Sequence, residues 1–141
     1  MVLTSLMLLN SCGNTKEIDQ SINWSISLNK GGCMDVCDAY QISINKQGSY
    51  NYNGVQNVKH LGQRAGELQV DDLQYVEELL ESIDWSNLEK EYGSPGPGVQ
   101  RKELIYTVGM ERVTIVYYRI EPQEIRNLEQ LIDQIIDNDE L

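Results

Sequence analysis

The sequence has few residues that can do acid–base or nucleophilic chemistry. It contains a single histidine, His60, and neither a G-x-S-x-G elbow nor an H-E-x-x-H motif occurs in it. A hydrolytic Ser–His–acid or Cys–His centre is therefore excluded unless His60 serves it. The expected role of His60 is that of a partly exposed strand residue. We expect a protein that is not an enzyme and that needs no cofactor.

Basic residues are also scarce. Lys and Arg number 11 against 22 Asp and Glu, which gives a formal net charge of −11. The acids are concentrated, with nine of them in residues 67–91 and seven in residues 121–141. Because binding to nucleic acid requires a concentrated basic face, this balance argues against a nucleic-acid partner.

The sequence has no apolar run of the roughly 20 residues that cross a bilayer. Its most apolar stretch is "MVLTSLMLLNSC", residues 1–12, which has the length and character of the apolar region of a secretory signal. The stretch ends in "LNSC" followed by Gly13, and this resembles a bacterial lipobox. The resemblance implies cleavage before Cys12 and attachment of lipid, including palmitate-type acyl chains, to that cysteine. We therefore expect a lipoprotein of the bacterial cell envelope, anchored in a membrane and facing the periplasm or the cell exterior.

The polar stretch that follows Cys12 has the composition of a tether, not of a core element. Cleavage before Cys12 would leave 141 − 11 = 130 residues, which suits one domain. The expected organisation is a signal segment at 1–11, a tether at 12–22 and a single domain at 23–141.

Two segments repeat apolar residues with a period near 3.6, which predicts amphipathic helices with acidic outer faces. Asp71 is expected to cap the first helix, and Pro122 is expected in the first turn of the second. The apolar positions are Leu73, Val76, Leu79, Leu80 and Ile83 in the first, and Ile125, Leu128, Leu131, Ile132, Ile135 and Ile136 in the second.

Elsewhere apolar residues alternate with polar ones, as in half-buried strands. Residues 24–28 and 40–44 follow this pattern, and "NKQGSYNY" then predicts a hairpin closed by Gly48. That hairpin sets Tyr50 opposite Ile44 and Tyr52 opposite Ile42.

Two more strands are expected near 104–108 and 113–119. The second is apolar on both faces, as in a central strand. The Gly- and Pro-rich residues 92–98 before them predict a mobile surface loop. The fold class is therefore α+β, with an antiparallel sheet of about six strands and two amphipathic helices packed on one face.

The order of these motifs resembles a known bacterial family. A C-x3-C pair at the start of a strand precedes Tyr40, the "INKQGSYNYNG" hairpin, "NVKHLG" and an amphipathic helix. Over roughly residues 23–137 this is similar to the family called domain of unknown function 6438. The chain departs from the family pattern at Asp35 and Asp38, where a small residue and a proline are usual. The resemblance implies an envelope or secreted setting, and it implies no activity.

Cys33 and Cys37 remain as a pair once Cys12 carries lipid, and three roles are open to them. In an oxidising compartment a disulfide that staples the turn is expected. A copper(I) site would use both cysteines with Met34 or His60, and thiol-redox chemistry would normally require C-x-x-C in a thioredoxin-like setting.

For the whole chain we expect a lipid-anchored, non-enzymatic binding module. A protein partner is expected over a small ligand, because neither a Gly-rich phosphate cradle nor an aromatic pocket is visible in the sequence.

Overall fold

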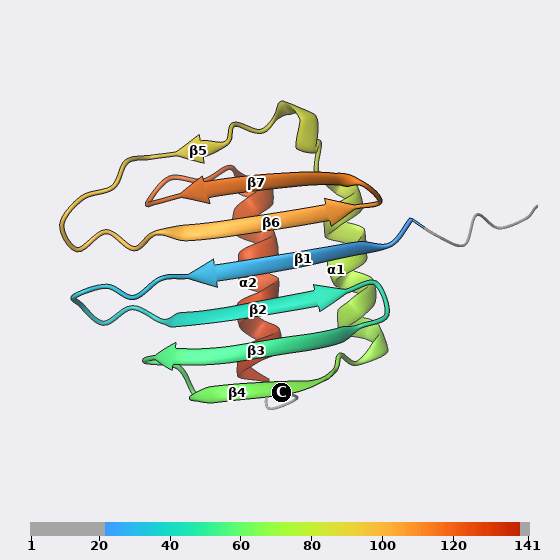
Figure 1. Cartoon of the computed structure of the whole chain (residues 1–141), viewed down its shortest axis with the longest axis horizontal. Coiled ribbons are helices and arrows are strands. Elements are labelled where there is room, and N and C mark those ends of the chain that lie inside the picture. Colours follow the sequence, from blue (N-terminus) through green and yellow to red (C-terminus); the bar gives the residue numbers. More distant parts are fainter. Residues whose placement is uncertain (1–21, 139–141) are drawn as a thin grey trace, which may run out of the picture.

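The computed structural model describes residues 22–138 as one sheet crossed by two helices (Figure 1). The expected signal segment, Cys12 and most of the tether lie outside the described residues. The helices are α1 (Val70–Ser82) and α2 (Gln123–Asp137), with a short 3-10 helix, η1 (Trp85–Asn87). The strands are β1 (Trp24–Lys30), β2 (Ala39–Asn45), β3 (Ser49–Gln56), β4 (Gly62–Glu67), β5 (Glu91–Tyr92), β6 (Lys102–Val108) and β7 (Glu111–Tyr117).

All the strands form a single sheet in the order β4-β3-β2-β1-β6-β7-β5. Every pair is antiparallel except β5 with β7. The α+β class, the two helices and the mostly antiparallel sheet are as predicted, but the sheet has seven strands instead of about six. The additional strand is β5, whose two residues are too few to produce a periodic pattern.

The predicted hairpin between β2 and β3 is confirmed. Ile44 pairs with Tyr50 and Ile42 with Tyr52. Gly48 has a φ of +85° and donates its N–H to the carbonyl of Asn45 at 2.9 Å, which closes the turn. This left-handed backbone conformation favours glycine, because glycine has no Cβ to clash.

Both predictions about helix starts were wrong. Gln69 is the N-cap of α1, so Asp71 lies within the first turn and does not cap the helix. There its charge still interacts favourably with the helix dipole. Pro122 is the N-cap of α2 and not a residue of its first turn.

The position predicted for the strand at 113–119 was also wrong. The strand β7 lies second from the edge, with only the two residues of β5 outside it. Its outward residues are Arg112, Thr114 and Val116, so β7 is apolar on the core face and mixed on the open face. Tyr117, at the end of β7, is fully buried.

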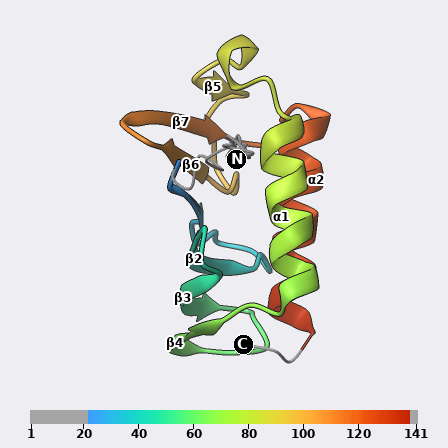
Figure 2. The ribbon, with the colours of Figure 1, turned by 90° about the vertical axis from the view of Figure 1, so that its right-hand side faces the viewer.

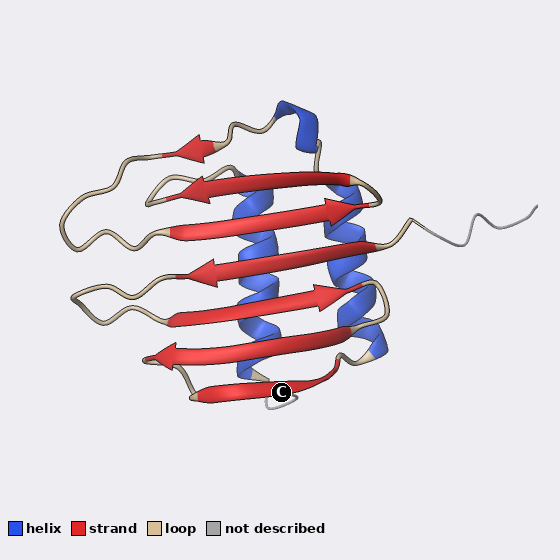
Figure 3. Cartoon of the chain, in the orientation of Figure 1, coloured by secondary structure: helices blue, strands red, loops and turns tan. Residues whose placement is uncertain are grey.

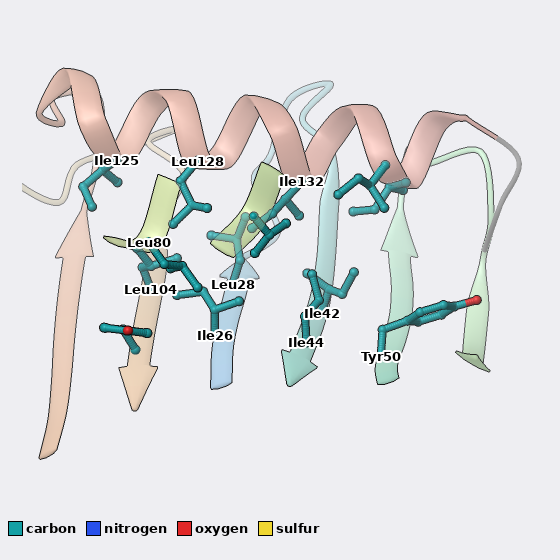
Figure 4. Packing of buried hydrophobic residues seen from close by; sticks show 14 of the residues in the cluster. Ile26, Leu28, Ile42, Ile44, Tyr50, Leu80, Leu104, Ile125, Leu128 and Ile132 are labelled. Carbon is teal, nitrogen blue, oxygen red and sulfur yellow. The ribbon is translucent and has the colours of Figure 1, made fainter. Parts of the chain in front are cut away.

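The core lies between the sheet and the helices. Ile26 and Leu28 of β1 are 1% exposed, and Figure 4 shows them with Leu80 of α1 and Leu128 of α2. Burying each such side chain contributes roughly 1.5–3 kcal/mol. Figure 2 shows both helices on the same side of the sheet. Figure 3 views the other side, which we call the open face, where no described helix or strand lies over the sheet.

Candidate functional site

The open face is hollowed at its centre. Because successive side chains of a strand point to opposite faces, the residues that alternate with the core carry their side chains here. The hollow has a volume of about 640 Å³. The side chains that line it from the open face are Ser27, Asn29, Gln41, Ser43, Asn51, Asn53, Gln63, Ala65, Glu103 and Ile105.

Four carboxamides lie in line across this hollow. Asn29 pairs with Gln41, Gln41 with Asn53, and Asn53 with Gln63. We call these four residues the carboxamide row. Neighbouring strands are about 4.8 Å apart, so the row spans about 14 Å from β1 to β4. Glu103 of β6 pairs with Asn29 and continues the line.

A second line of polar residues runs beside the carboxamide row. Ser27 pairs with Ser43, Ser43 with Asn51, and Asn51 with Ala65. On the other side of Ser27 lies Ile105 of β6. The two lines together make a surface of hydroxyls and carboxamides with few apolar side chains.

The carboxamide row is not used to hold the fold together. Among residues 22–138, none of its four side chains forms a hydrogen bond with another group of the chain. Each carboxamide carries two N–H donors and one carbonyl acceptor. These groups are therefore free to hydrogen-bond to water or to a ligand.

A different polar cluster lies on the helix side, beneath α2. Lys30 contacts Asp133 at 2.9 Å and Glu129 at 3.1 Å, and Lys102 contacts Glu129 at 2.7 Å. The Tyr117 hydroxyl donates to Glu129 at 2.7 Å. The Tyr40 hydroxyl donates to Asp133. We call these six residues the α2 network.

The charged groups of the α2 network shift one another's pKa values. Burial raises the pKa of Glu129, but the hydrogen bond from Lys102 and the charge of Lys30 outweigh it, so the net pKa is lowered. Burial lowers the pKa of Lys30, but the charges of Glu129 and Asp133 outweigh it, so the net pKa is raised. Lys30 and Glu129 are thus held in their charged forms.

Burial, and then the neighbouring carboxylates, raise the pKa of Tyr40 and Tyr117. Both phenols therefore stay protonated and act as donors. With every member paired, the network joins α2 to the ends of four strands, and its chemistry is that of a structural clamp.

The cysteine pair is a disulfide in the β1–β2 loop, as predicted. Cys33 and Cys37 are bonded, with their Cα atoms 6.1 Å apart. A copper(I) site would need the two thiolates that this bond consumes. Met34, the third proposed ligand, is 96% exposed. Residues 22–138 hold no group of three or more His, Cys, Asp or Glu side chains placed to bind a metal.

The structure places His60 outside any strand, which corrects the sequence prediction. It lies in the turn between β3 and β4, where its backbone carbonyl accepts a hydrogen bond from the Tyr52 hydroxyl at 2.9 Å. Neither His60 nor the cysteine pair lines the open-face hollow.

Sequence reasoning missed both clusters, although each left a signal. Lys30 follows Ile26 and Leu28 in the buried phase of β1, and Glu129 falls on the apolar stripe of α2. A charged residue at a position whose periodicity predicts burial indicates a buried partner of opposite charge. The row is a set of amides in the exposed phase, which becomes visible only once the strand order is known.

No helix of the described part of the chain is long and apolar enough to cross a membrane. No curated protein matches the sequence. A family model described as "Domain of unknown function (DUF6438)" matches residues 24–136, from the first residue of β1 to the last turn of α2. Since this match covers most of the sequence and the whole sheet, the chain belongs to the DUF6438 family.

Proposed function

We propose that this chain is a lipid-anchored protein of the bacterial cell envelope and that it is a binding module, not an enzyme. Its binding surface is the open-face hollow. The observation that carries the proposal is the carboxamide row, four aligned side chains that form no hydrogen bond within residues 22–138. Polar groups that converge on a concave surface are typical of binding sites.

The layout of the sheet suits an anchor at Cys12. The described chain begins at Ile22, beside the start of β1. The seven residues of β1 then carry the chain about 23 Å to the disulfide loop at the opposite end (Figure 1). With a lipid on Cys12, the disulfide loop would lie at the end of the domain opposite the tether. The open face, which the two helices do not cover, would be accessible from the side.

The test measures retention of the protein on washed envelope fragments of its own bacterium. The full chain carries Cys12→Ser so that a lipid cannot itself hold it to the membrane. Gln41→Arg adds a bulky charge in the middle of the carboxamide row. Gln134→Arg adds the same charge at an exposed position of α2, away from the open face.

We expect Gln41→Arg to weaken retention about tenfold or more, the equivalent of about 1.4 kcal/mol, and Gln134→Arg to leave it unchanged. Circular dichroism checks that both variants are folded. Equal retention of the two variants, or no retention of the parent, contradicts a binding role for the open face.

A further inference from the structure

We infer that the ligand of the open-face hollow is an uncharged saccharide chain that lies across the strands along the carboxamide row. This inference rests on the proposed function, because it names the class of ligand for the same surface. Three properties of the hollow support it: its hydrogen-bonding groups, its charge and its length.

The hydrogen-bonding groups of the hollow match those of a sugar. Carboxamides and hydroxyls both donate and accept, and the hollow presents Asn29, Gln41, Asn53 and Gln63 beside Ser27 and Ser43. Sugar hydroxyls and acetamido groups also donate and accept within one small unit. A ligand that only accepts or only donates can pair with half of these groups at most, whereas a sugar can pair with both kinds.

The charge of the hollow excludes anionic ligands. Among residues 22–138, Glu103 is the only charged side chain that reaches the hollow from the open-face side, and it is paired with Arg101 at 2.8 Å. The side chain of Arg64 lies on the helix side, because Arg64 pairs with the buried Tyr52. Phosphates and nucleic acids bind to Arg, Lys or helix N-termini, and the hollow offers none of these on its open side.

The composition of the hollow also argues against a protein partner. The centres of protein interfaces are enriched in aromatic residues, Met and Arg. In the described part of the chain, the apolar side chains on the open side of the hollow are only Ala65 and Ile105. A protein partner would find little apolar area to bury here. The C–H faces of a sugar are small and need little apolar area on the protein.

The length of the hollow favours a chain over a single sugar. The row repeats a carboxamide at each strand, about every 4.8 Å and over about 14 Å. One pyranose unit of an extended glycan is comparable in length to this repeat. Successive sugars can therefore meet successive carboxamides. Without an aromatic ring for stacking, each contact is weak, so binding depends on several units acting together.

The test is a nuclear magnetic resonance titration of the full chain carrying Cys12→Ser. The probes are the uncharged tetrasaccharides chitotetraose, cellotetraose, mannotetraose and maltotetraose. The side-chain amide signals of Asn29, Gln41 and Asn53 are expected to shift with at least one probe. The amide signal of Gln134 on α2 is expected to stay in place.

Two variants measure the contribution of the row. Gln41→Ala and Asn53→Ala are each expected to weaken binding of that probe about fivefold to tenfold, as for the loss of a hydrogen-bonding group. Gln134→Ala is the matched control and should bind as the parent does. Absence of shifts with all four probes, or shifts confined to residues outside the open face, overturns the saccharide assignment.

A protease treatment separates this inference from the proposed function. If envelope fragments digested with protease no longer retain the parent, while intact fragments retain the parent but not Gln41→Arg, the partner is a protein. In that case the open face is a binding surface and the saccharide assignment is wrong. Retention that survives the protease and remains sensitive to Gln41→Arg supports the saccharide.

Discussion

Tyr117 donates its hydroxyl proton to Glu129 at 2.7 Å and so joins β7 to α2. The same carboxylate lies between two lysines that pair directly across β1 and β6, Lys30 and Lys102. Without Glu129 these two positive charges would face each other on the buried side of the sheet. The placement of α2 therefore depends on a polar contact as well as on its apolar stripe.

Replacing Glu129 with Gln removes the negative charge that the two lysines share. Because one partner of a buried ion pair is lost and the other charges remain, we expect the free energy of unfolding to fall by about 3 kcal/mol. Urea denaturation of the full chain measures it. Glu124→Gln, in the exposed first turn of the same helix, is the control and should cost no more than about 1 kcal/mol, the value of a carboxylate at a helix N-terminus. Equal stability of the two variants would show that the α2 network contributes little.

The pH dependence of stability follows from the same carboxylate. The pKa of Glu129 is lowered in the folded state, so its stabilising contribution is present above the ordinary glutamate pKa and is lost as the pH falls through the lowered value. The raised pKa of Lys30 has the opposite sign. Its contribution is present below the ordinary lysine pKa and is lost as the pH rises through the raised value.

Denaturation at a series of acidic pH values tests this dependence. We expect the parent to lose stability below about pH 4.5, the ordinary pKa of a glutamate, more steeply than Glu129→Gln does. Above that range the difference between the two proteins should be constant until the pH approaches the raised pKa of Lys30. Parallel curves through the acidic range would contradict the lowered pKa of Glu129.

The regular parts of this fold were predictable because periodicity records which face of an element is buried. The alternation in Ile26 and Leu28 gave β1, and the register of Tyr50 with Ile44 followed from the turn at Gly48. The class and both helices followed as well. The missed strand, β5, could not be predicted in this way, because its two residues are too few to show an alternation of buried and exposed side chains.

The candidate site was harder to predict because it depends on strand order. Asn29 and Gln63 are far apart in sequence, and nothing local indicates that three strand pairings bring them into one line. The pairing of Lys30 with Lys102 likewise depends on β1 lying beside β6, a contact between segments more than 70 residues apart. The Cys33–Cys37 bond could be predicted because it is local.

The disulfide should stabilise its loop and not the whole fold. A loop of about five residues gives about 2 kcal/mol in the chain-entropy estimate, at the low end for disulfides. We expect the double variant Cys33→Ser, Cys37→Ser to lose no more than this in urea denaturation and to keep the spectrum of the folded parent. A variant that fails to fold would show that the bond does more than staple the turn.

Thiol titration decides whether the pair acts as a disulfide in its own compartment. Protein purified from the envelope without reductant, then denatured, should show no free thiol from Cys33 or Cys37. Metal analysis of the same sample is the companion measurement. Two free thiols or stoichiometric copper would instead favour the copper(I) role that the sequence left open.

Membrane attachment is predicted to depend on Cys12. Several acyl chains, at about 0.8 kcal/mol for each buried CH2, are enough for stable anchoring without a membrane-spanning helix. Cys12→Ser should therefore move the protein out of the membrane fraction or leave it uncleaved, and intact mass spectrometry should show the loss of lipid mass. Cys33→Ser combined with Cys37→Ser is the control, because it removes the other cysteines and should leave the protein in the membrane. A Cys12→Ser protein that fractionates with the membrane and keeps the mass of the parent would show that the anchor is elsewhere.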